Sequence, residues 1–365
     1  MAATIDPPAD ARRPADDSLR DMAISVVMPV YNGADVLRAS LAPLLAMLRA
    51  GEIAEIIVVD DGSTDGTAAI ATECHARLLH SGGRLGPGGA RNVAAPAAVG
   101  DVLWFVDADV VVHNDAARML VASFRCSGAT AVFGSYDDRP SGRNFLSQYK
   151  NLVHHYYHHR EGGDAETFWA GCGAVRRDIF LASGGFDAVT YRYPSIEDIE
   201  LGFRLRQRGL RIVLAPEVQG THLKVWRLGN LLYTDIFRRA LPWSRLIHAK
   251  SALPNALNVR FGERINAALA VGLLLAIALA GATLLPFWVP LAVVAAVAVA
   301  NRRLFDVFRR ARGPLFAVAG VAFHQLYYLY GSAVYAWCWL EGLAKNLRDL
   351  LLGAGRRTRR GERHD

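Results

Sequence analysis

Three short apolar runs, each rich in β-branched residues, restrict this chain to folds that contain fully buried strands. The runs cover residues 24–30, 55–61 and 102–107, and each is followed at once by a turn signal or a carboxylate. Helix-forming stretches separate them, over about 34–49 and again after a capping segment at 63–67. Strands that alternate with helices predict a mostly parallel sheet covered by helices on both faces, which is an α/β fold.

Carboxylates close two of these strands. Asp60 ends the second, and Asp107 ends the third with Asp109 two residues further on. Ligands of open parallel sheets bind outside the carboxyl ends of the strands. An Asp-X-Asp pair there offers hard oxygen ligands to Mg²⁺ or Mn²⁺, which would neutralise a departing diphosphate. An isolated pair of this kind is more often a solvated loop, so its meaning depends on the surrounding motifs.

Five motifs occur in a fixed order and carry a resemblance. They are VMPVYN at 27–32, VVDDGSTD at 58–65, GGARN at 88–92, DAD at 107–109, and Glu197-Asp198. Over residues 24–223 this order resembles glycosyltransferase family 2. The resemblance implies a GT-A type fold, that of nucleotide-diphospho-sugar transferases, and a nucleotide-sugar donor, for which we expect a UDP-sugar.

The resemblance also implies a nucleotide-binding set. The nucleoside lies along Pro29 and Tyr31, Asp60 accepts a hydrogen bond from the base, and Arg91 helps to place the nucleotide. Physical chemistry agrees, because a ring and a carboxylate recognise a nucleobase and a guanidinium suits phosphate oxygens. The complete predicted set is Pro29, Tyr31, Asn32, Asp60, Gly62, Arg91 and Asp107.

Catalytic and acceptor residues follow from the same resemblance. Asp198, beside Glu197 at a predicted helix start, matches the position that deprotonates an acceptor hydroxyl in an inverting displacement; helix capping is the simpler interpretation. A lipid phosphate acceptor would need no base. The predicted substrate-binding residues are Gly171, Cys172 and Gly173, and the predicted ligands of Mn²⁺ or Mg²⁺ are Asp107, Asp109 and His222.

The run HHYYHH at 154–159 places two histidine pairs at i,i+4 spacing on a predicted helix. No further ligands are evident for a zinc site, so we interpret the run as an amphipathic helix near the acceptor or the membrane surface.

The composition changes near residue 264. Residues 265–285 are uncharged and apolar, long enough to cross a bilayer, and 291–300 continue apolar after Pro286 and Pro290, which predicts a helical hairpin. A loop with five arginines at 301–313 and a third apolar segment at 314–340 follow. The positive-inside rule places both that loop and the basic tail at 356–360 in the cytoplasm. Either 314–340 is therefore re-entrant or interfacial, or the tail is outside; we expect two crossings.

Charge and cysteine content limit the partners and the compartment. The net charge of +7 arises after residue 300, where twelve Lys and Arg face five Asp and Glu, and its position beside apolar segments indicates anionic lipid rather than nucleic acid. Four scattered cysteines indicate neither a disulfide framework nor zinc.

The predicted domains are a disordered tail at 1–22 without a signal peptide, a catalytic domain at 23–225, interfacial helices at 226–263, a membrane region at 264–341 and a basic cytoplasmic tail at 342–365. We expect a multi-pass protein of the cell inner membrane whose catalytic domain is cytoplasmic. It would transfer a sugar to a lipid-linked or membrane-associated acceptor. The alternatives are a polyprenyl-phosphate glycosyltransferase, a nucleotidyltransferase, which lacks its expected glycine-rich phosphate loop here, and an inactive membrane scaffold, which would have lost its acids.

Overall fold

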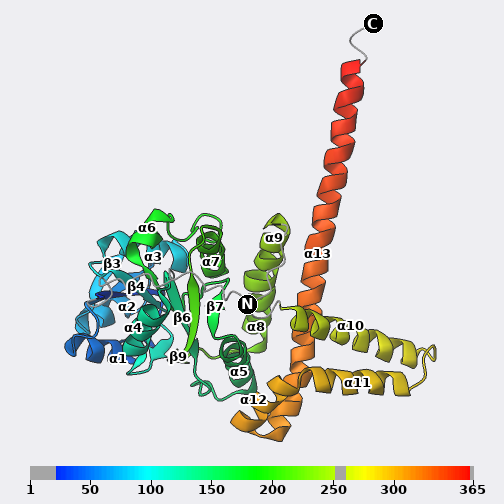
Figure 1. Ribbon diagram of the computed structural model, residues 1–365, viewed down its shortest axis with the longest axis horizontal. Helices are drawn as coiled ribbons and strands as arrows, with labels where there is room; N and C mark the ends of the chain where they lie inside the picture. The colour runs from blue at the N-terminus through cyan, green and yellow to red at the C-terminus, as the bar shows by residue number, and fades with distance from the viewer. Residues whose placement is uncertain (1–21, 251–259, 362–365) are drawn as a thin grey trace, which may run out of the picture.

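The computed structural model describes residues 22–250 and 260–361. The predicted disordered tail lies outside these residues except for Met22, and the masked part of the predicted interfacial segment, 251–259, lies outside them too. A nine-stranded sheet forms the centre of the catalytic domain (Figure 1). Its strands are β1 (Ile24–Val30), β2 (Glu55–Asp60), β3 (Arg77–His80), β4 (Val102–Val106), β5 (Val110–Val112), β6 (Ala131–Tyr136), β7 (Gly163–Ala165), β8 (Cys172–Arg176) and β9 (Ile212–His222).

The order in the sheet is β3-β2-β1-β4-β8-β6-β9-β5, and β7 pairs with β9. The first four strands are parallel, with Val27 of β1 opposite Ile57 of β2 and Phe105 of β4. Beyond β4 the sheet becomes mixed, because β8 runs antiparallel to both β4 and β6. The prediction of an α/β fold is confirmed, and the parallel arrangement holds for the half of the sheet that carries the predicted nucleotide motifs.

Helices cover both faces of the sheet, which explains why its strands read as continuous apolar runs. One face packs on α1 (Leu37–Arg49) and α4 (Ala116–Ser127), and the other on α3 (Gly86–Ala97), α6 (Arg177–Ala182) and α7 (Glu197–Gln207). Met28 faces the first layer and Val27 the second, as the alternation of a strand requires. The short helix α2 (Thr67–Glu73) lies beside β3, and α5 (Phe145–Arg160) contacts β6.

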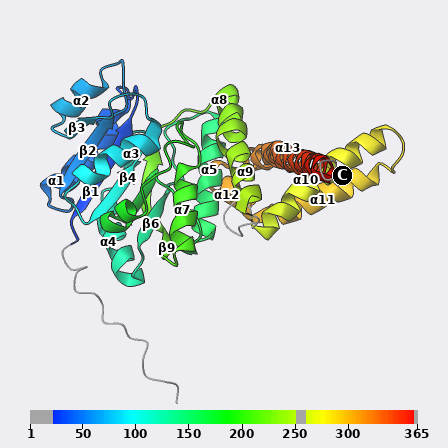
Figure 2. The same cartoon turned by 90° about the horizontal axis from the view of Figure 1, so that it is seen from above.

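The C-terminal third is helical. Three consecutive segments, α8 (Leu228–Tyr233), the π-helix η2 (Thr234–Ala240) and α9 (Leu241–Lys250), precede a hairpin of α10 (Phe261–Gly281) and α11 (Trp288–Ala300). The hairpin projects away from the catalytic domain and runs transverse to the last helix (Figures 1 and 2). The predicted hairpin and its proline-containing turn are therefore present.

One expectation for this region was wrong, and one of the alternatives left open for it is excluded. The basic segment expected as a loop forms the helix α12 (Arg302–Arg312), because its arginines surround Leu304 and Phe308, which are buried. The third apolar segment is not re-entrant: α13 (Pro314–Gly361) is one continuous helix that also includes most of the expected basic tail.

Within the described residues, α10 alone is both long and apolar enough to cross a membrane, and α11 is a shorter apolar helix. The expected second full crossing is therefore not supported.

Aromatic and polar contacts join α5 to the C-terminal helices. Tyr149 packs on Phe308 of α12 and on Phe323 of α13. Glu263 of α10, 4% exposed, accepts hydrogen bonds from Tyr157 at 3.1 Å and from Tyr328 at 2.5 Å. The catalytic domain and the apolar helices are thus held together by a buried interface.

Candidate active site

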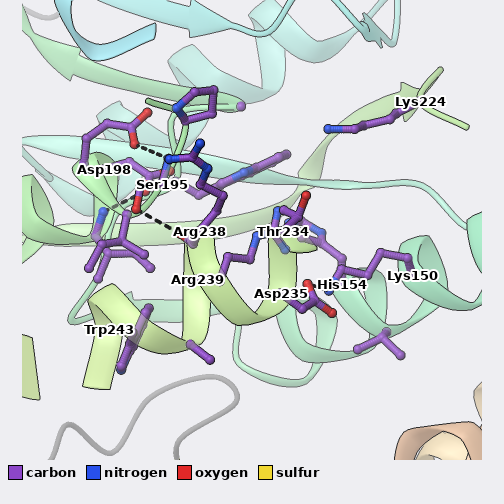
Figure 3. A pocket seen from close by; sticks show the side chains of 18 of the residues that line it. Lys150, His154, Ser195, Asp198, Lys224, Thr234, Asp235, Arg238, Arg239 and Trp243 are labelled. Carbon is purple, nitrogen blue, oxygen red and sulfur yellow. Dashed lines mark hydrogen bonds and ion pairs between the residues drawn. The ribbon is translucent and has the colours of Figure 1, made fainter. Parts of the chain in front are cut away.

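A single cavity of about 1340 Å³ lies at the carboxyl ends of β1 and β4 and continues to the C-terminal helices. Its walls include the loops after the parallel strands, the start of α7, one side of α5, and the group formed by η2, α10 and α13. Figure 3 shows the middle of this cavity, where side chains from α7 and η2 face those of α5. The chain regions that sequence analysis treated separately therefore meet around one space.

The turn that follows β1 forms one end of the cavity. Tyr31, 38% exposed, lies under the guanidinium of Arg84, which is 3.7 Å from its ring centre. Asn32 adopts a positive φ of 48°, a conformation that asparagine tolerates, and its side chain accepts a hydrogen bond from the Thr64 amide at 2.8 Å. An aromatic face and a guanidinium are thereby presented together at the cavity wall.

Asp60 and Asp61 are neighbours in the sequence, but only Asp61 lines the cavity. Asp61 lines the cavity and accepts hydrogen bonds from the amides of Leu85 and Gly86, both at 2.8 Å. Asp60, the predicted base-binding residue, is 6% exposed and accepts from the Ser63 amide at 2.9 Å, which is a turn-stabilising contact. The sequence analysis assigned nucleotide binding to Asp60 and gave no role to Asp61.

Most of the predicted site residues line the cavity, and four do not. The lining residues are Pro29, Tyr31, Asn32, Arg91, Asp107, Asp109, Gly171, Glu197, Asp198 and His222. Asp60, Gly62, Cys172 and Gly173 are absent from the wall. Cys172 is buried in β8, and this burial raises the pKa of its thiol to about 12, so it is an uncharged packing group.

Arg91, only 3% exposed, connects two of the predicted acids. Its guanidinium donates to Asp107 at 2.5 Å and to Glu197 at 3.4 Å. Burial, opposed by Arg91 and reinforced by the charges of Asp109 and Asp198, raises the pKa of Asp107. Burial and the neighbouring Asp198 raise the pKa of Glu197 to about 7. The acids therefore crowd one another, and a single guanidinium compensates them only in part.

The second acid of the DAD motif faces a histidine. His222, at the end of β9, lies with Nε2 3.5 Å from Oδ2 of Asp109. Although burial opposes it, the hydrogen bond and charge of His222 hold the pKa of Asp109 below its usual value. The antiparallel pairing of Val110 with His222 brings the two side chains together.

These residues fit a divalent cation by their donor atoms. Among the described residues no three His, Cys, Asp or Glu side chains are already arranged around a metal position, and Asp107 instead accepts a hydrogen bond from Arg91. Two neighbouring carboxylates, of which Asp109 raises the pKa of Asp107, and an imidazole 3.5 Å from Asp109 are nevertheless suitable ligands for Mn²⁺ or Mg²⁺. A cation there would relieve the repulsion between Asp107 and Asp109.

Asp198 is held by the start of its own helix. Its carboxylate accepts hydrogen bonds from the amides of Ile199 at 2.8 Å and Ala170 at 3.1 Å, which fix its orientation in the cavity. Burial still raises its pKa. A carboxylate with raised proton affinity and fixed orientation is suited to accept a proton from a bound hydroxyl.

Aromatic rings form a wall beside the acids that sequence analysis did not identify. Tyr136 stacks on His222 at 4.3 Å between ring centres, and its other neighbours are His154 at 4.4 Å and Trp169 at 4.8 Å. Both ring nitrogens of His154 lack hydrogen-bond partners in the described structure, and burial lowers its pKa well below the usual value. The predicted helix of the histidine run is confirmed, and the end of β6, where Tyr136 lies, carried no sequence signal.

The π-helix η2 forms the wall opposite. Asp235, buried, accepts from Lys150 at 2.5 Å and from Tyr330 of α13 at 2.8 Å, and Arg238 and Arg239 follow it on the same segment (Figure 3). π-Helices are rare and are frequently associated with functional sites. Both arginines fall within residues 226–263, which the sequence predicted as interfacial helices, and neither was predicted as a site residue.

Comparisons with known proteins agree with this geometry. The solved mannosyltransferase PcManGT from Pyrobaculum calidifontis, in complex with GDP-Man and Mn²⁺, superposes with a TM-score of 0.59 over 89% of this chain and 91% of its own, at 20% identity. At that identity the likeness establishes the fold. The protein therefore has the GT-A type fold of nucleotide-sugar transferases, which confirms the predicted fold class.

Residues 25–183 match the sequence profile described as glycosyl transferase family 2. Glycosyltransferase AglD from Haloferax volcanii is 35% identical over 39% of this chain and 25% of its own length. The pre-mycofactocin glycosyltransferase of Mycobacterium tuberculosis is 27% identical over 62% of this chain and 48% of its own. The matched region thus spans between a quarter and about half of these relatives. Residues 25–183 therefore match glycosyltransferase family 2, the family whose motifs the sequence resembles.

Proposed function

We propose that this protein transfers a sugar from a nucleoside diphosphate sugar to a lipid-linked acceptor, by a metal-dependent, inverting displacement. One observation carries the proposal: Asp107, Asp109, His222 and Asp198 line one end of a single cavity in a family-2 domain. The same cavity continues to α10, the helix that is long and apolar enough to enter a membrane.

Donor binding is assigned to the loops after the parallel strands. The nucleoside would lie against Tyr31 with Arg84 above the ring, and Asp61 is the carboxylate within the cavity that can accept from the base. Arg91 would orient the diphosphate from beneath through its contact with Asp107. A UDP-sugar remains our expected donor, and the GDP-Man in PcManGT makes GDP-sugars the second to test.

Asp107, Asp109 and His222 would hold Mn²⁺ or Mg²⁺, and such an ion supplies Lewis-acid stabilisation of the departing diphosphate. The presence of Mn²⁺ in PcManGT supports this assignment. Asp198 would take the proton of an acceptor hydroxyl while its two backbone donors hold the carboxylate in line with the sugar. Glu197 would position Arg91, which it contacts at 3.4 Å.

A lipid phosphate is the second candidate acceptor, because three cationic side chains line the cavity near the acids. Lys150, Lys224 and Arg239 come from α5, the segment after β9, and η2. Together they could bind an anionic acceptor group, which would then attack the sugar without a base. Asp198 would in that case orient the acceptor.

Membrane attachment is assigned to the α10–α11 hairpin. α10 exposes Leu274, Leu275 and Ile277, and the turn exposes Phe287 and Trp288, which are suitable for lipid contact. The chain after α11 returns to the catalytic domain, where Arg312 donates to Gln148 of α5 at 2.5 Å. The hairpin would therefore enter the bilayer from the side of the catalytic domain and return to that side.

The test is calorimetric binding of UDP-, GDP- and dTDP-sugars to the detergent-solubilised full chain, with and without Mn²⁺. One donor should bind with Mn²⁺, and Asp109→Asn should weaken the Mn²⁺-dependent part by at least about tenfold, or about 1.4 kcal/mol. The matched control is Asp115→Asn, which removes an exposed carboxylate outside the cavity and should bind like the wild type. Metal-independent binding, or none to any donor, would reject the proposal.

A further inference from the structure

The cavity continues past the reacting groups into a gap between α10 and α13. On α10 its wall is made of Ala267, Ala268, Val271, Gly272 and Leu275, and on α13 it includes Gly331, Ser332 and Tyr335. Small residues thus face each other where the two helices diverge. We call these eight residues the α10–α13 gap.

Open space in this gap is shown by its glycines. A Cβ placed on Gly272 or on Gly331 would meet no heavy atom within 4 Å, whereas one placed on Gly320, lower on α13, would contact the ring of Phe308 at 2.6 Å. The glycines of the gap are therefore not required for close helix packing. They leave room for something other than the protein.

The chemistry of the cavity wall changes along its length. Near α7 and η2 it carries Asp198, Arg239 and the Lys150–Asp235 pair. Next come the hydroxyls of Tyr330, which donates to Asp235 at 2.8 Å, and Tyr328, which donates to Glu263. Beyond them Val271 and Leu275 are apolar. The outer face of α10 beyond the gap exposes Leu274, Ile277 and Leu279.

We propose that the α10–α13 gap binds the hydrocarbon chain of the acceptor lipid, whose headgroup would extend from it toward Asp198. This inference rests on the proposed function and specifies its acceptor as a molecule with a long apolar chain. A water-soluble sugar or peptide acceptor would leave the apolar end of the cavity exposed to solvent, which is unfavourable by about 25 cal/mol per Å² of apolar surface.

The position of the apolar end of the α10–α13 gap favours a lipid chain as its ligand. Its apolar end adjoins the exposed leucines of the one described helix that can enter a bilayer. A chain that resides in the membrane can therefore reach the cavity sideways, without leaving an apolar environment. Its polar end lies among cationic and hydroxyl groups that suit a phosphate or sugar headgroup.

The experiment uses the full chain in phosphatidylcholine nanodiscs with hexadecyl phosphate that carries a terminal diazirine, at about one per cent of the lipid. After irradiation, labelled peptides are mapped by mass spectrometry. Labelling should be enriched at residues 267–275 and 327–335 over the outer positions 277–285. Equal labelling of both regions would show ordinary lipid contact and overturn the proposal.

Matched variants of each helix provide the specificity test. Gly272→Leu and Gly331→Leu place a side chain in the open gap, and Gly281→Leu and Gly342→Leu place the same side chain on the same helices outside the cavity, also without steric conflict. Labelling should fall at least about fivefold in the first pair and stay unchanged in the second. Unchanged labelling in both gap variants would contradict the assignment.

Donor binding by calorimetry separates this inference from the function on which it rests. Both gap variants should bind the nucleotide sugar like the wild type, which also shows that they fold. If the wild type binds no nucleotide sugar, the proposed function fails whatever the labelling. If donor binding is normal and labelling is not enriched in the gap, the hydrocarbon site alone is wrong.

Discussion

Arg91 is the residue on which the charges of the site depend. It is almost fully buried, yet it contacts both Asp107 and Glu197. A buried guanidinium without carboxylate partners would be costly, and so would buried carboxylates without the guanidinium. The Arg91 contacts therefore link the DAD strand end to the first turn of α7. Through Arg91 the site has one connected charge network.

Asp198→Asn should separate donor binding from transfer. Asparagine keeps the size of the side chain, and its single oxygen can retain one of the two amide contacts, because Ala170 donates to Oδ2 and Ile199 to Oδ1 of the aspartate. Without a base, transfer to a hydroxyl acceptor should fall by about 10²–10⁴-fold, with the donor Kd within about twofold of wild type. Steady-state kinetics and calorimetry measure the two. Asp178→Asn, an acid in the first turn of α6, is the control.

Retained turnover in Asp198→Asn, with an intact donor Kd, would mean that the acceptor needs no base. That result would favour the lipid phosphate acceptor over the hydroxyl acceptor. Loss of donor binding together with turnover would instead assign Asp198 to the donor site.

Glu197 predicts a pH dependence of stability. Its folded pKa of about 7 lies above the usual glutamate value of 4.5, so folding favours the protonated form. The contribution of Glu197 to the free energy of unfolding is therefore fully present below about pH 4.5 and is lost as the pH rises through about 7. The loss amounts to at most about 3 kcal/mol. Thermal unfolding from pH 5 to 8 should show a smaller decline in Glu197→Gln. Parallel profiles for both proteins would contradict this assignment.

At the scale of elements, η2 connects the catalytic cavity to α13. Its wider turn brings Asp235 to Lys150 of α5 and to Tyr330 of α13, while Arg238 packs over the ring of Tyr193 at 4.5 Å. Burial opposes ionisation of Asp235, but Lys150 outweighs it and lowers the pKa of that carboxyl. One short segment therefore contacts three separate parts of the fold.

Sequence patterns predicted elements best where burial was complete. The parallel strands β1, β2 and β4 were found because both faces are covered and their sequences are continuously apolar. Strands β6, β8 and β9 were missed, because Gly134, Gly173 and Pro216 interrupt their apolar pattern. Since β9 positions His222 and β6 positions Tyr136, the aromatic wall of the site could not be predicted. The amphipathic spacing of α12 was present in the sequence, but its charge was interpreted as a loop.

The interface among α5, α10 and α13 gives a prediction at the same scale. Glu263→Gln removes the buried charge that Arg160 contacts at 2.6 Å and weakens the hydrogen bonds from Tyr157 and Tyr328. Breaking one partner of a buried pair costs about 3–5 kcal/mol, and the partial exposure of Arg160 places this case near the lower end. Thermal unfolding of the full chain in detergent should detect a fall of several degrees.

Glu341→Gln is the matched control for that change. Glu341 pairs with Arg245 of α9 at 3.2 Å, but both side chains are largely exposed, and exposed pairs contribute about 0–1 kcal/mol. Its melting temperature should stay close to that of the wild type. Equal effects of the two substitutions would show that Glu263 contributes no more than a surface acid.

At the scale of the whole molecule, α13 lies along the catalytic side. His324 contacts Tyr149 of α5 at 2.7 Å, and the ring of Tyr335 lies 4.8 Å from that of His248 in α9; Tyr330, which contacts η2, lies at the edge of this face. The opposite face exposes Leu315, Val318, Leu326, Trp337 and Leu340. These positions share one side of the helix at 3.6 residues per turn. α13 therefore has one face toward the protein and an apolar face directed away from it.

This arrangement favours one solution to the conflict between the two basic segments. If α13 crossed the bilayer, its companions α5, η2 and α9 would have to lie in the hydrocarbon with it, although they carry the charged wall of the active site. We therefore propose that α13 lies along the membrane surface with its apolar stripe toward lipid, which would leave both basic segments on the side of the catalytic domain. The sequence left this interfacial placement as one of its alternatives and could not select it, because the contacts that hold α13 are long-range.

A cysteine placed in the tail tests this orientation. In a variant whose only cysteine is Ala354→Cys, an impermeant maleimide should react from the same side of sealed vesicles as it does with a variant that retains only Cys126, an exposed cysteine of the catalytic domain. Phe287→Cys, in the turn of the α10–α11 hairpin, should not react from that side if the hairpin inserts into the bilayer as proposed. Reaction of Ala354→Cys from the opposite side would make α13 a crossing, and the contacts of its first half with α5, η2 and α9 would then have to break in the membrane-bound protein.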